Sequence, residues 1–166
     1  MFTSTEEVAD FIYEQNIELV DVRFCDVPGV QQHFTIPVSE FLDAALSDGL
    51  MFDGSSVRGF TAIHESDMKL IPDISSAFVY PFRDRKTLGV NFSIVDPFTD
   101  EPFSRDPRQV AAKAEAYLRS TGIADECFIG AEAEFYLFDD VRYQVTPHNT
   151  FFSVDSPEAY WNTGRA

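Results

Sequence analysis

The sequence predicts an α+β fold: a small mixed sheet with helices, followed by the start of a second α+β part. The strands are predicted from alternating apolar and polar side chains, the two-residue period of a half-buried strand, in residues 18–24, 31–37 and 87–94. The helices are predicted from apolar side chains spaced three and four residues apart in 4–15 and 39–49. A stretch punctuated by prolines, 96–108, marks the boundary between the two parts.

The N-terminal helix is expected to begin after Ser4, which can cap it, while Glu7 closes a capping box. Its core-facing stripe consists of Val8, Phe11 and Ile12. A hairpin is expected next, because the two strand-like segments 18–24 and 31–37 flank a turn with the sequence CDVPGV.

A shorter helix is expected over 39–49, with Ser39 as its cap and Gly49 at its C-terminal end. Its apolar stripe consists of Phe41, Leu42, Ala45 and Leu46. Two short extended pieces, 68–73 and 77–82, are limited by prolines. The clearest strand comes after them, because its alternation is the most regular in the chain.

The second part begins with a helix that Asp106 can cap, with Pro107 at its first position and Gly122 near its end. Its inward-facing residues are expected to be Val110, Ala111, Ala114, Tyr117 and Leu118. An apolar, aromatic strand is expected over 128–138, and a turn-rich tail without a strong period follows it. Because one helix and one strand cannot bury their apolar faces alone, we expect the chain to be the opening piece of a larger protein.

Two glutamates, Glu132 and Glu134, interrupt this apolar strand. In a strand, side chains two residues apart share a face, with Cβ atoms roughly 7 Å apart. Carboxylates in apolar surroundings are costly and repel each other, so positive charge is expected beside them. The spacing suits two ions, each held by one carboxylate, and Mg²⁺ and Mn²⁺ prefer oxygen ligands.

Two other interpretations of the glutamate pair stay open. The segment can be an edge strand whose glutamates are solvated. The pair can also act as a general acid and base without metal, although carboxylates on one short strand are badly placed to flank a scissile bond from two sides.

A loop with the sequence MFDGSSVRGF, residues 51–60, combines the carboxylate of Asp53 with serines and glycines. It lacks the spacing of a phosphate-binding P-loop. We expect either a surface turn or a loop that presents a carboxylate and hydroxyl groups to a partner surface. Met51 and Phe52 would anchor its start, and Phe60 its end.

The composition argues against several classes of protein. With 28 acidic and 12 basic residues, the net charge is −16, which disfavours binding to nucleic acid or to an anionic membrane. No apolar run is long enough to span a bilayer, and the first residues lack the pattern of a secretory signal. The only cysteines, Cys25 and Cys127, are expected to be free thiols in a cytoplasmic protein.

The remaining candidate ligands give weak signals. The three histidines, His33, His64 and His148, lack the spacing of zinc ligands. Arg105 and Arg108 are expected to pair with nearby acids rather than with a phosphate.

Taken together, the motifs resemble type I glutamine synthetase. The residues of VRGF and GAEAEF are similar to those of the actinobacterial form of the bacterial enzyme. The resemblance covers nearly the whole chain and is weakest in the last twenty-odd residues. The matching segments, in the family's order, are LVDVRFCDVPGVQQHFTIP, MFDGSSVRGF, HESDMKLIPD, SRDPR and STGIADECFIGAEAEFYLFDDVRY.

The resemblance implies an enzyme that joins ammonia to glutamate with consumption of ATP. The γ-carboxylate of glutamate is phosphorylated, and ammonia then displaces the phosphate. Two divalent ions, Mg²⁺ or Mn²⁺, are implied, with Glu132 and Glu134 as ligands of one ion each. Asp53 matches the loop aspartate that binds ammonium and takes a proton from it, and Ser56 matches a serine that supports this loop.

The resemblance also implies the organisation of the protein. Residues 1–103 correspond to a β-grasp-like N-terminal domain, and residues 104–166 to the beginning of an incomplete catalytic domain. The loop with Asp53 is expected to enter the active site of a neighbouring subunit, in a cytoplasmic dodecamer of two stacked hexameric rings.

Two departures from the family pattern bear on function. Phe60 stands where enteric relatives carry tryptophan, which leaves apolar packing as its role. The family's remaining metal ligands and its ATP and glutamate contacts lie beyond Ala166, so the chain alone is expected to be inactive. An alternative is a truncated or pseudo-enzyme that acts as a regulatory or assembly partner of full-length rings.

Overall fold

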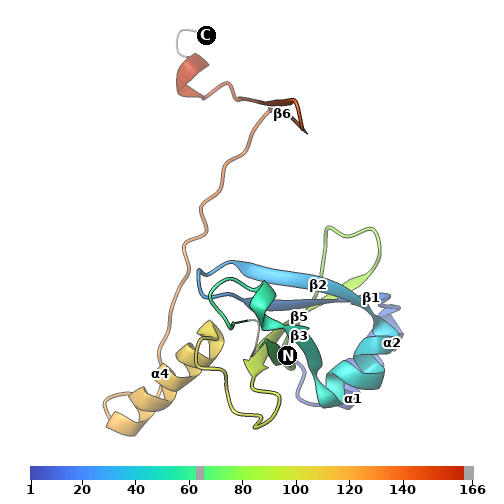
Figure 1. Cartoon of the computed structure of the whole chain (residues 1–166), viewed down its shortest axis with the longest axis vertical. Coiled ribbons are helices and arrows are strands. Elements are labelled where there is room, and N and C mark those ends of the chain that lie inside the picture. Colours follow the sequence, from blue (N-terminus) through green and yellow to red (C-terminus); the bar gives the residue numbers. More distant parts are fainter. Residues whose placement is uncertain (63–65, 163–166) are drawn as a thin grey trace. The chain divides into compact units, whose positions relative to one another are not determined.

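The computed structural model describes residues 1–62 and 66–162. The chain divides into two compact units, residues 1–127 and 128–166, each of which is described by itself (Figure 1). The α+β character predicted from the sequence is confirmed, since the first unit combines helices with a mainly antiparallel sheet.

The first unit is built on a five-stranded sheet with the order β2-β1-β5-β4-β3. Its strands are β1 (Leu19–Cys25), β2 (Gln31–Pro37), β3 (Leu50–Asp53), β4 (Asp67–Val79) and β5 (Thr87–Val95). The two central strands, β1 and β5, run parallel, and the other neighbours are antiparallel. The hairpin predicted from the sequence is therefore confirmed as the β1–β2 pair.

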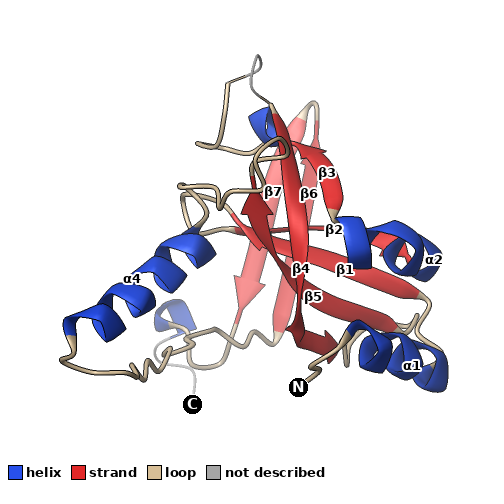
Figure 2. Ribbon diagram, turned by 90° about the horizontal axis from the view of Figure 1, so that it is seen from below, coloured by secondary structure: helices blue, strands red, loops and turns tan. Residues whose placement is uncertain are grey.

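The helices of the first unit are α1 (Thr5–Gln15), α2 (Val38–Glu40), a π-helical turn η1 (Phe41–Ala45), α3 (Leu46–Asp48), a 3₁₀ turn η2 (Gly54–Ser56) and α4 (Pro107–Thr121). Helices α1 and α2 lie near each other beside the sheet (Figure 2). The buried side chains of α1 and η1 share one apolar core with the sheet residues Val20, Val22, Leu88, Val90, Phe92 and Ile94. The alternation seen in the sequence thus becomes one buried face of the sheet.

The capping residues behave as the sequence predicts at both long helices. Ser4 Oγ accepts a hydrogen bond from Glu7 N at 3.2 Å, while the Glu7 carboxylate reaches back to Thr3 N at 2.7 Å. Asp106 caps α4 through Arg108 N at 2.9 Å, and its second oxygen accepts from Ile94 N at 2.9 Å. Asp106 is fully buried, so this carboxylate joins the start of α4 to the central strand β5.

Two boundaries predicted for the first unit are wrong. The second helical segment begins at Val38, so Ser39 lies inside it and no side-chain hydrogen bond caps it. The two short extended pieces are one strand, β4, which runs through Pro72 with a register shift between Asp73 and Phe78. Pro72 is tolerated because β4 pairs with β3 only up to Leu70, so one edge of the strand is free there.

The apolar stripe predicted for α4 is not buried in this chain. No residue of the helix is buried, and Val110 and Tyr117 expose 52% and 72% of their surface. Helical spacing predicts which side chains share a face, but burial also needs a surface to pack against. The helix itself ends as predicted, with Gly122 in the left-handed conformation.

The second unit differs from its prediction in two ways. Residues 128–138 form no strand among the described residues and are exposed throughout. The tail is instead a hairpin, β6 (Asp140–Thr146) and β7 (Asn149–Asp155), followed by the 3₁₀ turn η4 (Tyr160–Asn162). A strand exists through its hydrogen bonds to a neighbour, and no described strand pairs with residues 128–138.

A buried carboxylate lies on the sheet face opposite the helices. Asp21 has no exposed surface, and its oxygens lie 3.0 Å from His33 Nδ1, 3.0 Å from Thr35 Oγ1 and 2.9 Å from the Tyr80 hydroxyl. Burial by itself raises the pKa of Asp21, but the hydrogen bonds from His33, Tyr80 and Thr35 outweigh it and hold the pKa below its ordinary value. In its charged form, this carboxylate therefore joins β1 to β2 and to Tyr80, the residue that follows β4.

We expect Asp21→Asn to lower the free energy of unfolding of the chain at pH 7 by about 2 kcal/mol, because it disrupts hydrogen bonds to a buried charged group. The pKa of Asp21 is lower in the folded than in the unfolded chain. The stabilisation that its carboxylate provides is therefore present above about pH 4 and is lost as the pH falls through the pKa of the folded state. Urea unfolding of both proteins should therefore give a difference that shrinks in acid. Asp84→Asn, at an exposed position, is the matched control, and an equal loss there would contradict the assignment.

Candidate functional site

The loop after β3 holds Asp53 at the surface in a conformation set by its own serines. Asp53 Oδ1 accepts hydrogen bonds from Ser55 N at 2.9 Å and from Ser55 Oγ at 2.6 Å. Asp53 Oδ2 accepts from Ser56 Oγ at 3.2 Å. These bonds cap the short turn η2, so the sequence DGSS dictates the local fold.

The same hydrogen bonds determine the charge of this carboxylate. The side-chain and backbone bonds from Ser55 hold the pKa of Asp53 below its ordinary value, and Ser56 adds to the effect. Asp53 therefore carries a negative charge at neutral pH. Because a carboxylate can accept about four hydrogen bonds and three are used within the loop, Oδ2 can accept a further donor.

Aromatic side chains anchor the loop at both ends. Phe52 packs on Phe24 with ring centroids 5.2 Å apart, and Phe60, only 1% exposed, packs on Phe103 at 5.4 Å. The predicted anchoring roles of Phe52 and Phe60 are thus confirmed. The role predicted for Met51 is wrong, because its side chain is 59% exposed.

The paired glutamates lie in the second unit, on the irregular segment 128–138. Both Glu132 and Glu134 are exposed, and neither forms a hydrogen bond or an ion pair with a described residue. The shared strand face predicted for them is not formed, because the segment lacks a pairing strand. Their carboxylates are therefore available to an external partner.

The donor chemistry of this pair fits a hard divalent cation, since both groups offer carboxylate oxygens. Within residues 1–62 and 66–162, however, no group of three or more acidic, histidine or cysteine side chains is placed to hold a metal ion. The pair would therefore need further ligands to complete a site.

The histidines and arginines have other roles in the described chain. His33 lies beside the buried carboxylate of Asp21, and His148 is exposed in the turn between β6 and β7; His64 falls outside the described residues. Arg108 forms the predicted ion pair with an acid, Asp73. The same prediction is wrong for Arg105, which donates to the backbone carbonyls of residues 59 and 60 instead.

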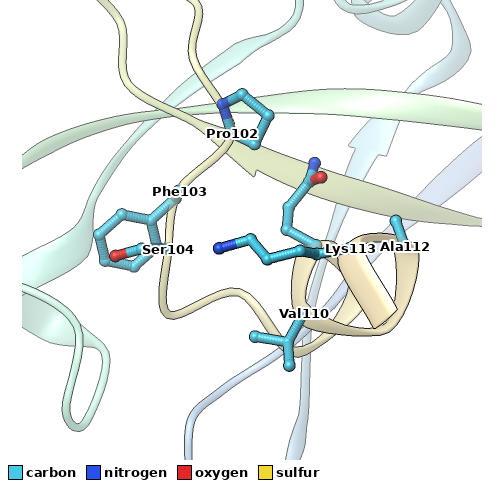
Figure 3. Close-up of a pocket in the computed structure, with 7 residues that line it drawn as sticks. Pro102, Phe103, Ser104, Val110, Ala112 and Lys113 are labelled. Atoms are coloured by element: carbon cyan, nitrogen blue, oxygen red, sulfur yellow. The ribbon is translucent and has the colours of Figure 1, made fainter. Parts of the chain in front are cut away.

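A surface pocket lies between the first turns of α4 and the segment 96–106, which follows β5 and is called the junction below (Figure 3). Pro102, Phe103 and Ser104 line it from the junction, and Val110, Ala112 and Lys113 line it from the helix. None of the predicted site residues lines this pocket, so it does not mark the predicted chemistry.

One residue of the loop was missed by the sequence prediction. Ser55, rather than Ser56, makes the shorter and more numerous contacts with Asp53. The signal was present in the sequence, because a serine two residues after an aspartate has its backbone N–H in the position that an Asx turn or helix cap uses.

Comparison with known proteins gives consistent results along the chain. A family model described as "Glutamine synthetase, beta-Grasp domain" matches residues 16–97, and one described as "Glutamine synthetase, catalytic domain" matches residues 104–165. The first description agrees with the small N-terminal sheet domain that the sequence predicts.

Individual relatives agree with the family models. Glutamine synthetases from two actinobacteria, Frankia alni and Mycolicibacterium smegmatis, are 58% and 57% identical over 99% and 97% of this chain. The cryo-EM structure of Plasmodium falciparum glutamine synthetase is similar in fold, with a TM-score of 0.70 over 92% of this chain and 30% of that one, at 21% identity. The chain spans about a third of the length of the curated relatives it matches, 35% and 34% for the two named here.

We expect Ser55→Ala to raise the pKa of Asp53 toward its ordinary value, because the variant removes the 2.6 Å hydrogen bond to Oδ1. Ser56→Ala, which removes the 3.2 Å bond to Oδ2, is the matched variant and should raise it less. Titration of the Asp53 carboxyl carbon, followed by NMR, measures the pKa of Asp53 in both variants. A larger rise in the Ser56 variant would reverse the assignment made from the distances.

Proposed function

The chain belongs to the glutamine synthetase family, and from that premise we propose that it supplies part of the active site of an enzyme that joins ammonia to L-glutamate with consumption of ATP. The family match over both segments supports this proposal. The observation that carries it is the surface loop in which two serines hold Asp53 charged and leave one oxygen able to accept a donor.

In the proposed reaction, the γ-carboxylate of glutamate attacks the terminal phosphorus of ATP, and ADP leaves. The nitrogen of ammonia then forms a bond to the carbonyl carbon of the γ-glutamyl phosphate, and inorganic phosphate leaves with the electrons of the broken C–O bond. Asp53 attracts ammonium through its charge and accepts the proton that the nitrogen must lose before or as it attacks. Its exposed position at the end of β3 suits contact with a substrate or another subunit.

Glu132 and Glu134 are the proposed ligands of two divalent ions, Mg²⁺ or Mn²⁺, one carboxylate for each. When bound, these ions would neutralise phosphate charge and orient the reacting groups for phosphoryl transfer. The two carboxylates have no described partner, which leaves their oxygens available as ligands. The remaining ligands would come from other parts of the whole protein.

We also propose the assembly and location that the family implies. In a dodecamer of two stacked hexameric rings, the loop with Asp53 would complete the site of a neighbouring subunit. The domain boundary is proposed between residues 103 and 104. No described helix is long and apolar enough to cross a membrane. The thiols of Cys25 and Cys127 are not joined in a disulfide, which fits the reducing cytoplasm proposed for the protein.

The proposed metal role can be tested in a chimera that joins this chain to the remaining part of the Frankia alni relative, to which it is 58% identical over 165 residues. We expect Glu134→Gln to lower synthetase activity by at least about 100-fold, because loss of a direct ligand should cost no less than loss of a residue supporting one. Activity measured over a range of Mg²⁺ concentrations checks this.

The matched control is Glu126→Gln, at an exposed glutamate eight residues earlier, which should leave the Mg²⁺ dependence unchanged. Circular dichroism and ring assembly should be the same in both variants. Unchanged activity of Glu134→Gln at saturating and at limiting Mg²⁺ would exclude the ligand role.

The 166-residue chain by itself should form no glutamine from glutamate, ammonium and ATP, because the described residues do not complete a metal site. It should also bind Mg²⁺ only weakly in calorimetric titration. Turnover by the purified chain comparable to that of the chimera would refute the proposed division of the active site.

A further inference from the structure

The structure assigns Arg105 a role that none of the sequence patterns indicates. We propose that Arg105 is a positioning residue that holds the end of the Asp53 loop against the central strand, and thereby sets the binding of ammonium. This inference rests on the proposed function, and it is built from three sets of contacts within the first unit.

The start of the loop is fixed by the sheet. Asp53 pairs with Asp67 across β3 and β4, and Gly54 N donates to Ser66 O at 2.6 Å. A side chain at residue 54 would meet Met68 at 2.6 Å, so only glycine allows this close approach. The loop therefore leaves the sheet in one defined direction.

The end of the loop is fixed by Arg105. Its Nη1 donates to Gly59 O at 3.1 Å and to Phe60 O at 2.6 Å. These contacts from a charged donor hold two successive carbonyls, and such bonds are stronger than neutral ones. Gly59 has φ of +85°, a backbone conformation that suits glycine, and a Cβ at this position would lie 3.3 Å from Val27 Cβ.

Arg105 is itself held by its neighbours. Phe103 N donates to Ile94 O at 2.9 Å, and the Asp106 carboxylate accepts from Ile94 N at 2.9 Å. Arg105 therefore lies between two residues, Phe103 and Asp106, that are both hydrogen-bonded to the backbone of Ile94 in β5. Since Phe103 also packs on Phe60, the junction and the loop form one connected arrangement.

Through these contacts, the junction supports the Asp53 loop. Loss of the Arg105 side chain would leave the aromatic packing in place and release the carbonyls of residues 59 and 60. The loop would then sample more conformations at the end opposite its sheet anchor. A misplacement of a reacting group by about 1 Å can reduce catalysis about 100-fold.

The test compares Arg105→Ala, Arg105→Lys and Arg108→Ala in the Frankia chimera, with ammonium chloride, glutamate and ATP varied in turn. Arg105→Ala should raise the KM for ammonium roughly tenfold and leave the other two KM values within about twofold. Arg105→Lys should restore most of the affinity, because its ammonium group can still donate to both carbonyls. Arg108→Ala is the matched control, since it breaks an ion pair with Asp73 and does not contact the loop.

A second readout separates this inference from the proposed function. In the 166-residue chain, Arg105→Ala should move the NMR titration of the Asp53 carboxyl carbon toward that of an ordinary aspartate, and Arg108→Ala should not. The inference is overturned if Arg105→Ala moves neither this titration nor the ammonium KM while Asp53→Asn raises that KM. If Asp53→Asn leaves the ammonium KM unchanged, the role of Asp53 in the proposed function is overturned, and the carboxyl titration still decides whether Arg105 orders the loop.

Discussion

The first unit depends on β5, the middle strand of its sheet, which pairs with β1 in parallel and with β4 antiparallel. Its side chains are buried or half-buried along its whole length. Because both edges of β5 are hydrogen-bonded to neighbouring strands, its backbone is held on both sides. The backbone of Ile94 in this strand forms hydrogen bonds with Phe103 and with the Asp106 side chain. Through these residues, β5 positions both the start of α4 and the end of the Asp53 loop.

The elements that the sequence predicted correctly are those whose signals are local. Helix caps at Ser4 and Asp106 depend on one side chain and a backbone N–H two or three residues away. Strands β1, β2 and β5 alternate clearly and find partners within the chain, so prediction and structure agree. Pro72 was misread because its effect depends on whether an edge of the strand is free, which the local sequence does not reveal.

The elements that the sequence misjudged are those that need a distant partner. The apolar face of α4 and the aromatic segment 128–138 have the composition of buried structure, yet the described chain offers them no surface or strand to pair with. For the proposed site, the sequence predicts Asp53 and the glutamate pair by pattern and resemblance. It did not identify Arg105, because a contact between residues 45 positions apart is visible only in the folded chain.

We propose that two kinds of carboxylate serve one reaction: an aspartate held by serines binds ammonium, and a pair of exposed glutamates binds metal ions. The most direct test is a cryo-EM structure of the Frankia chimera with Mg²⁺ and ADP at a resolution that shows individual ions. We expect the carboxylates of Glu132 and Glu134 to lie about 2.1 Å from separate metal ions beside the nucleotide phosphates. Carboxylates directed into bulk solvent, with the ions held entirely by other residues, would contradict the account.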